Sequence, residues 1–129
     1  MLNTPSPLGG RSKRAQALAL WAPAVVWAVL IYYLSSLPGS TIPSPFFSAD
    51  KVFHLGVYAV LGYLVARALG YYGGARRFAM VLSVLICFLY ALSDEFHQSF
   101  VPDRTPSFMD VTADTVGSLI GFFICSRKR

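Results

Sequence analysis

The sequence predicts an all-α fold, a polytopic membrane protein built as a bundle of four transmembrane helices with a polar pocket at the extracytoplasmic side. Of 129 residues, 55% are hydrophobic and only 13% are charged, against roughly 25% charged in an ordinary soluble domain. A chain this short leaves much of its surface outside the core, so lipid must cover the apolar side chains. The apolar residues also fall into four long runs, with basic and acidic residues gathered at opposite ends of them.

Each apolar run is long enough to cross a hydrocarbon core of roughly 30 Å as a helix. The predicted spans are about 15–37, 52–72, 78–98 and 108–125. A basic start before an apolar run also fits a signal peptide. That apolar region would be too long, and no small-residue cleavage site follows it cleanly, which favours an uncleaved first span.

One domain covers residues 15–126 in this interpretation. A disordered basic arm at 1–14 precedes it, and a basic tail at 127–129 follows. Pro38 and Gly39 end the first span, and the pair Gly73–Gly74 turns the chain between the second and third spans.

Lysine and arginine residues predict the orientation. Nine of the eleven lie at the two chain ends and around the second connection, and only Lys51 and Arg104 lie on the other side. Short loops rich in these residues stay in the cytoplasm, which predicts a multi-pass protein of the cell membrane with cytoplasmic N- and C-termini. The basic residues form short clusters between apolar runs rather than one basic face. Nucleic-acid binding is therefore not expected, and the expected partner is the lipid bilayer.

All acidic residues fall at the extracytoplasmic ends of the spans: Asp50, Asp94, Glu95, Asp103, Asp110 and Asp114. Ionisable groups at that depth normally face the bundle interior or a water-filled cavity. On the fourth span, the two aspartates at positions 110 and 114 share a helical stripe with Gly117 and Gly121. Glycines on such a stripe allow a neighbouring backbone to approach closely, so the stripe is predicted to face another helix.

Two further stripes carry polar groups to the same depth. Asp50, His54 and Tyr58 follow at four-residue steps on the second span, and Tyr90, Asp94 and Gln98 do so on the third. Glu95 is turned about 100° away from the stripe of the third span. We expect the three stripes to converge on one site.

Several strings resemble the hallmark motifs of the VanZ-like membrane protein family. They are Asp50-Lys51-Val52-Phe53-His54 followed by Tyr58; Asp94-Glu95-Phe96-His97-Gln98; Phe100, Pro102 and Arg104; Ser107 and Asp110; Gly117 and Gly121; and Ser35-Ser36-Leu37-Pro38. The family often has Asn where this chain has Asp114, and His97 lies outside the family pattern and is expected to be exposed. The resemblance implies a small multi-span protein, and the name-giving member is associated with resistance to the glycopeptide teicoplanin.

Ten residues are candidates for the site. The catalytic candidates are Asp50, His54, Asp94, Glu95, Gln98 and Asp110, and the substrate-binding candidates are Lys51, Tyr58, Arg104 and Asp114. His54, or Asp94 with Glu95, would act as general acid and base, and Lys51 with Arg104 would hold a phosphate.

Several of these residues also have a simpler structural explanation. Asp110 and Asp114 lie near a helix N-terminus, where carboxylates favour the helix dipole. Arg104 can form an ion pair with Asp94, Glu95 or Asp110 instead of binding a phosphate. His54 can be a buried histidine whose hydrogen bonds are made within the protein core. A divalent cation such as Mg²⁺, Ca²⁺, Mn²⁺ or Zn²⁺ also suits several carboxylates and one imidazole, although no ligand spacing here is diagnostic.

The leading functional hypothesis is a VanZ-like integral membrane protein that binds or modifies an amphiphilic envelope molecule, either a lipid headgroup or a lipid-linked cell-wall precursor. The resemblance implies a link to glycopeptide resistance of the teicoplanin type. The alternative is a non-enzymatic lipid-translocating or membrane interaction protein. The sequence does not decide whether the protein is an enzyme, and it leaves the oligomeric state open.

Overall fold

The computed structural model describes residues 12–41 and 49–128, and this part of the chain is all-helical. The four long helices are α1 (Lys13–Ser35), α2 (Ala49–Leu69), α3 (Arg76–Gln98) and α4 (Phe108–Arg127). Two short 3-10 helices, η1 (Gly39–Thr41) and η2 (Gly70–Tyr72), follow α1 and α2. Each long helix is long and apolar enough to span a membrane. The predicted all-α bundle of four such helices is therefore confirmed.

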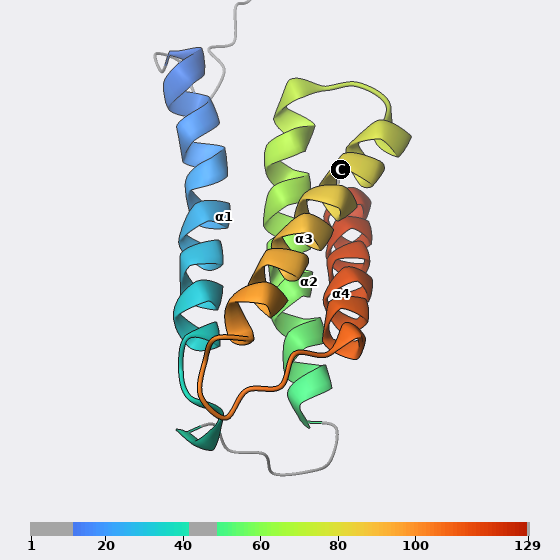
Figure 1. Cartoon of the computed structure of the whole chain (residues 1–129). Helices are drawn as coiled ribbons and strands as arrows, with labels where there is room; N and C mark the ends of the chain where they lie inside the picture. The colour runs from blue at the N-terminus through green and yellow to red at the C-terminus, as the bar shows by residue number, and fades with distance from the viewer. Residues whose placement is uncertain (1–11, 42–48, 129) are drawn as a thin grey trace, which may run out of the picture.

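The helices run alternately up and down, so that the C-terminal ends of α1 and α3 and the N-terminal ends of α2 and α4 lie at one end of the bundle, which we call the acidic end (Figure 1). Gly73 and Gly74 turn the chain at the opposite end with φ values of 72° and 100°, which side chains with a Cβ rarely adopt. Ser12 and Ser107 begin α1 and α4 by accepting a backbone N–H with their side chains. Most of the predicted arm at 1–14 lies outside the described residues, and its last two residues form the first turn of α1.

Helices α2 and α4 pack with their backbones in close contact. An ideal Cβ on Gly117 would lie 2.2 Å from the carbonyl oxygen of Leu55, and one on Gly121 would lie 2.0 Å from that of Ala59. From the other side, a Cβ on Gly62 would lie 2.3 Å from the Ser118 carbonyl oxygen. The predicted glycine face of α4 is therefore confirmed, and its partner is α2. We call this contact the α2–α4 seam.

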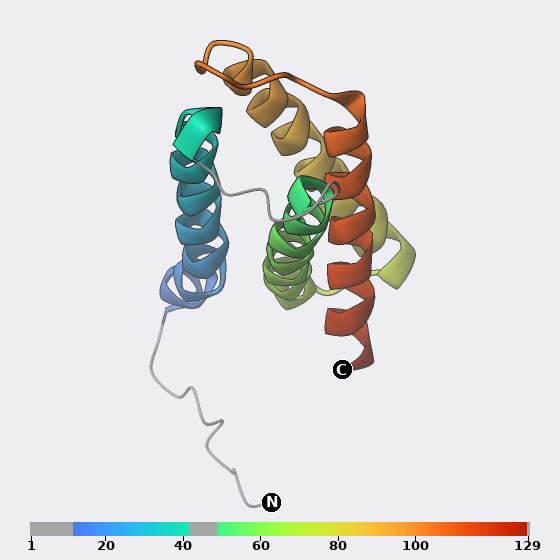
Figure 2. The same ribbon diagram turned by 90° about the horizontal axis from the view of Figure 1, so that it is seen from below.

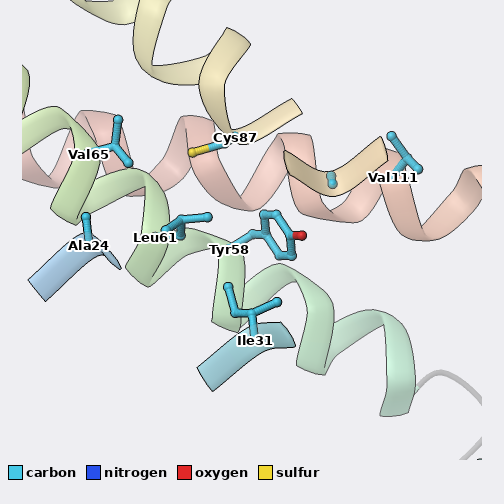
Figure 3. Packing of buried hydrophobic residues seen from close by; sticks show 8 residues of the cluster. Ala24, Ile31, Tyr58, Leu61, Val65, Cys87 and Val111 are labelled. Atoms are coloured by element: carbon cyan, nitrogen blue, oxygen red, sulfur yellow. The ribbon is translucent and has the colours of Figure 1, made fainter. Parts of the chain in front are cut away.

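Helix α1 stands apart from α4 and meets the bundle through α2 and α3 (Figure 2). Ala24 and Ile31 are the apolar residues that it buries, and they face Leu61 and Tyr58 of α2 (Figure 3). Most of the remaining surface of α1 is apolar and exposed, as expected of a helix that faces lipid.

Candidate functional site

Three helices bring charged side chains together at the acidic end of the α2–α4 seam. Residues 50, 51 and 54 come from the first turns of α2, residue 95 comes from the last turn of α3, and residues 110 and 114 come from the start of α4. We call this group the carboxylate–histidine cluster; its members are Asp50, Lys51, His54, Glu95, Asp110 and Asp114. Asp50 and Asp110 lie in the first turns of their helices, where a negative charge is favoured by the helix dipole.

His54 lies between the two aspartates of α4. Its Nδ1 is 2.9 Å from Oδ1 of Asp114, and its Nε2 is 4.0 Å from Oδ2 of Asp110. Lys51 donates hydrogen bonds to Asp110 and, at 2.8 Å, to Asp50. Because the contacts of His54 and Lys51 with the two aspartates of α4 cross from α2 to α4, the polar groups extend the glycine seam to the acidic end of the bundle.

Glu95 joins the cluster from α3. Its Oε2 accepts a hydrogen bond of 2.8 Å from the backbone N–H of Ser107, the residue that caps α4. One ligand-type atom of Glu95 lies within 4.8 Å of one such atom on His54 and one on Asp110. The expected meeting of the α2 and α4 stripes is therefore seen at His54, Asp110 and Asp114. From the third helix it is Glu95, expected to point away from the stripe of that helix, that joins them.

The cluster carries more negative than positive charge, and much of that charge is buried. Asp114 is fully buried, Asp110 and Glu95 are exposed by only 6% and 7%, and half of the Asp50 side chain is exposed. Lys51 is the lysine that faces these carboxylates. Within the described residues, Oε1 of Glu95 and Oδ2 of Asp114 are buried without a hydrogen-bond partner.

Asp94 belongs to a second network, directed toward α1. It accepts hydrogen bonds from Ser35 and, at 3.4 Å, from the Tyr58 hydroxyl. Gln98 donates to the same Ser35 hydroxyl at 2.9 Å. All four residues of this Asp94 network are buried. The hydrogen bonds of the candidate residues therefore form two groups, because Asp94 and Glu95 are neighbours on a helix and point in different directions.

Arg104 forms no ion pair with Asp94, Glu95 or Asp110 within the described residues. Its guanidinium donates to the backbone carbonyl oxygens of Leu37, at 3.1 Å, and Leu34, at 3.0 Å. Leu34 lies in the last turn of α1 and Leu37 just beyond it, and the Leu34 carbonyl also accepts the backbone N–H of Leu37 at 3.3 Å. Arg104 therefore ties the loop before α4 to the end of α1, and phosphate binding by Arg104 stays a prediction.

Some contacts could not be predicted as parts of the site. Ser35 holds both Asp94 and Gln98, although its only sequence signal was its place in the Ser35-Ser36-Leu37-Pro38 string. His97, expected to be exposed, is half-buried: its ring stacks on Tyr32 with centroids 4.5 Å apart, and its Nε2 is 2.9 Å from the Ser36 hydroxyl. Backbone N–H groups, such as that of Ser107, carry no sequence signal at all.

The polar pocket also stays a prediction. The structure has an open groove of about 360 Å³ between α3 and α4, and its lining is almost entirely apolar. The residues that line it are Met80, Val81, Val84, Leu85, Phe88, Thr115 and Leu119. None of the ten candidate site residues is among them.

Four helices that are long and apolar enough to span a membrane define a multi-pass α-helical membrane protein. A family model described as VanZ/LLP1 matches residues 12–129, nearly the whole chain. The protein belongs to the VanZ/LLP1 family, as the sequence motifs predicted. Comparison with curated proteins and with solved structures gave no match.

Proposed function

We propose that this protein binds or modifies an amphiphilic envelope molecule, either a lipid headgroup or a lipid-linked cell-wall precursor, at the carboxylate–histidine cluster. The observation that carries the proposal is the burial of Glu95, Asp110 and Asp114 beside His54 at one end of a membrane bundle. Ionisable groups inside a membrane are costly, and they commonly mark sites for polar ligands or protons. A cluster at this depth lies near the headgroups of the lipids that surround it.

The charge distribution supports an extracytoplasmic position for the cluster. Lys13, Arg14, Arg76, Arg77 and Lys128 lie at the end of the bundle opposite to it (Figure 1). Because short loops rich in Lys and Arg stay in the cytoplasm, we place both termini inside and the cluster beneath the outer leaflet. A role in glycopeptide resistance of the teicoplanin type, which the family resemblance implies, belongs to the same proposal.

In an enzymatic version, His54 is the candidate general base and Glu95 a candidate acid. The carboxylate of Asp114 lies against Nδ1 of His54, an arrangement that orients an imidazole and fixes its tautomer. Asp94 is less suited to that role, because its oxygens are occupied by Ser35 and Tyr58 in a buried network.

Native mass spectrometry of the gently purified full-length protein tests the proposal. We expect a co-purifying amphiphile of defined mass in the wild type, and reduced occupancy in Glu95→Gln if the protein is a binder. An enzyme with Glu95→Gln would instead retain the amphiphile and lose its conversion. Asp103→Asn is the matched control, since Asp103 is exposed on the loop at the same end and lies outside the cluster.

Two results would contradict the proposal. One is a protein that carries no amphiphile and shows no envelope or antibiotic phenotype when His54 and Glu95 are replaced by alanine. The other is a partner membrane protein that co-purifies in place of a lipid and is lost in the same variants. The second result would support a membrane interaction protein.

A further inference from the structure

We propose that His54, Glu95 and Asp110 form a binding site for one divalent transition-metal cation, with Mn²⁺ and Zn²⁺ the best-suited ions. One ligand atom from each of these residues lies within 4.8 Å of the other two. The residues come from α2, α3 and α4, so the cation would connect three helices at their acidic ends. The proposal does not rest on the proposed function, because a cation can bind whether or not an amphiphile does.

The histidine is oriented as a metal-ligating histidine usually is. Oδ1 of Asp114 lies 2.9 Å from Nδ1 of His54, and because a carboxylate oxygen only accepts, the Nδ1–H group donates the hydrogen bond. In that tautomer Nε2 carries the lone pair. This nitrogen faces Oδ2 of Asp110 at 4.0 Å.

Each of the two carboxylate ligands is held through one oxygen and keeps a second oxygen for a cation. Lys51 donates to Oδ1 of Asp110, and the Ser107 N–H donates to Oε2 of Glu95. Oε1 of Glu95 is buried and accepts no hydrogen bond from the described residues, and Oδ2 of Asp110 faces Nε2 of His54 at 4.0 Å. The hydrogen bonds to Asp114, Lys51 and Ser107 thus hold the three side chains through their other polar atoms.

Unpartnered buried oxygens provide an independent reason to expect a ligand. Oε1 of Glu95 and Oδ2 of Asp114 are both buried and accept no hydrogen bond from residues 12–41 or 49–128. Such atoms are rare in folded proteins, because a buried carboxylate oxygen without a donor loses its hydration and gains nothing in return. The cluster contains four carboxylates, and Lys51 offsets the negative charge of only part of them. A divalent cation would therefore also reduce the excess negative charge.

The mixture of ligands favours a transition metal. Mg²⁺ and Ca²⁺ prefer sites made of oxygen atoms alone, whereas an imidazole beside carboxylates suits Zn²⁺, Mn²⁺ or Fe²⁺. Metal–ligand distances of about 2.0–2.2 Å place the ligand atoms of one ion about 3 Å apart. The three side chains would therefore move inward on binding.

Calorimetric titration of the full-length protein in detergent, after dialysis against EDTA, tests the site. We expect ZnCl₂ and MnCl₂ to bind with one equivalent per chain, and MgCl₂ and CaCl₂ to bind at least about tenfold more weakly. Glu95→Gln keeps the shape of the side chain and should weaken Zn²⁺ binding by about tenfold or more. Asp114→Asn, which changes the partner of His54 but not a ligand, should weaken it by about 10- to 100-fold.

Controls separate loss of the site from loss of the fold. Asp103→Asn removes a carboxylate from the exposed loop at the same end and should bind Zn²⁺ like the wild type, and Asn tolerates the φ of 58° at this position. Thermal unfolding in EDTA identifies any variant that fails to fold. If Glu95→Gln fails to fold, Asp110→Asn provides a second substitution of a proposed ligand. Electron paramagnetic resonance of bound Mn²⁺ should show its spectrum change in Glu95→Gln.

Two results would overturn the proposal. The first is the absence of saturable Zn²⁺ or Mn²⁺ binding at concentrations up to about 1 mM. The second is wild-type affinity in folded Glu95→Gln and Asp110→Asn. Either result would leave the amphiphile proposal standing, because native mass spectrometry tests that separately.

Discussion

The α2–α4 seam and the attachment of α1 hold helices together by different means. Along the seam, Gly62, Gly117 and Gly121 bring two backbones into direct contact. Helix α1 has no such face and buries few apolar residues; hydrogen bonds connect it to the bundle along its length. Among these, Trp27 donates to the Val57 carbonyl at 2.9 Å, and Tyr90 donates to the Ala28 carbonyl at 2.5 Å.

This difference follows from the solvent. Lipid tails are as apolar as leucine, so burial of apolar surface does not drive helices together inside a membrane. Close packing of small residues and interhelical hydrogen bonds are the means that remain. The carboxylate–histidine cluster lies on the tightly packed seam, whereas the Asp94 network lies between α3 and the hydrogen-bonded α1. We therefore expect the cluster to be the more rigid of the two polar groups.

The largest effect is expected from a side chain placed in the seam. Gly121→Leu would put a Cβ 2.0 Å from the Ala59 carbonyl oxygen, a backbone atom that cannot rotate away. Helices α2 and α4 would have to separate along their length, so we expect no folded monodisperse protein in size-exclusion chromatography. Gly56→Leu is the matched control, because a Cβ on Gly56 meets nothing within 4 Å. Equal behaviour of the two variants would refute the backbone contact.

The second effect concerns the strongest polar attachment of α1. Ser35→Ala removes the donor to Asp94 and the acceptor of Gln98, both of them buried. Leaving buried polar groups unsatisfied costs about 1–3 kcal/mol, which we expect as a lower unfolding temperature. Both tryptophans of the protein, Trp21 and Trp27, lie in α1, so their fluorescence should change at a lower temperature than the circular dichroism of the whole bundle.

Ser93→Ala serves as the control for that variant. Ser93 is exposed on α3, and its hydroxyl donates to the Tyr90 carbonyl of its own helix. Its replacement should leave both unfolding signals unchanged within about 0.5 kcal/mol. A Ser35→Ala protein in which fluorescence and circular dichroism still change together would show that α1 does not separate first.

Periodicity predicted the seam and the carboxylate–histidine cluster better than it predicted the attachment of α1. The helical spacing of Asp110, Asp114, Gly117 and Gly121 fixes which side chains of the fourth span share a face. The four-residue steps from Asp50 to Tyr58 do the same for the second span, and these two faces met. Asp94 and Glu95 showed the limit of this reasoning, because periodicity gives the angle between neighbours but not the helix that each one faces.

The attachment of α1 depends on backbone groups, and these have no sequence pattern. Val57 and Ala28 accept hydrogen bonds through their carbonyl oxygens, which every residue carries, so no residue type marks them. The charge of Arg104 can be read from the sequence, and it suggested a carboxylate or a phosphate as the partner. That the guanidinium would also reach the backbone carbonyls of Leu34 and Leu37 could not be read from the sequence. The sequence shows which side chains have polar groups and does not show where the backbone offers partners.

The third effect is expected at the C-terminal end of α1, where Arg104 is bound. Arg104→Ala leaves the carbonyls of Leu34 and Leu37 without their side-chain donor, and because water can reach this end of the bundle we expect a loss of about 1 kcal/mol in unfolding free energy. Arg104→Lys keeps the charge but loses the forked donors that reach two carbonyls at once, so it should recover less than half of the loss. Full recovery with lysine in a thermal unfolding experiment would mean that charge, not geometry, holds the loop.

The smallest effect is expected from one isolated hydrogen bond at the middle of α1. Trp27→Phe keeps an aromatic ring and removes the bond to the Val57 carbonyl; interhelical bonds in membranes average about 0.6 kcal/mol, so the unfolding free energy should fall by about that amount. Tyr33→Phe is the control, because Tyr33 is an exposed aromatic residue of the same helix. Trp21 remains as the fluorescent probe of α1 in both variants. If Trp27→Phe instead detaches α1 as completely as Ser35→Ala does, the attachment of α1 is cooperative, since bonds that break together cannot be assigned separate contributions.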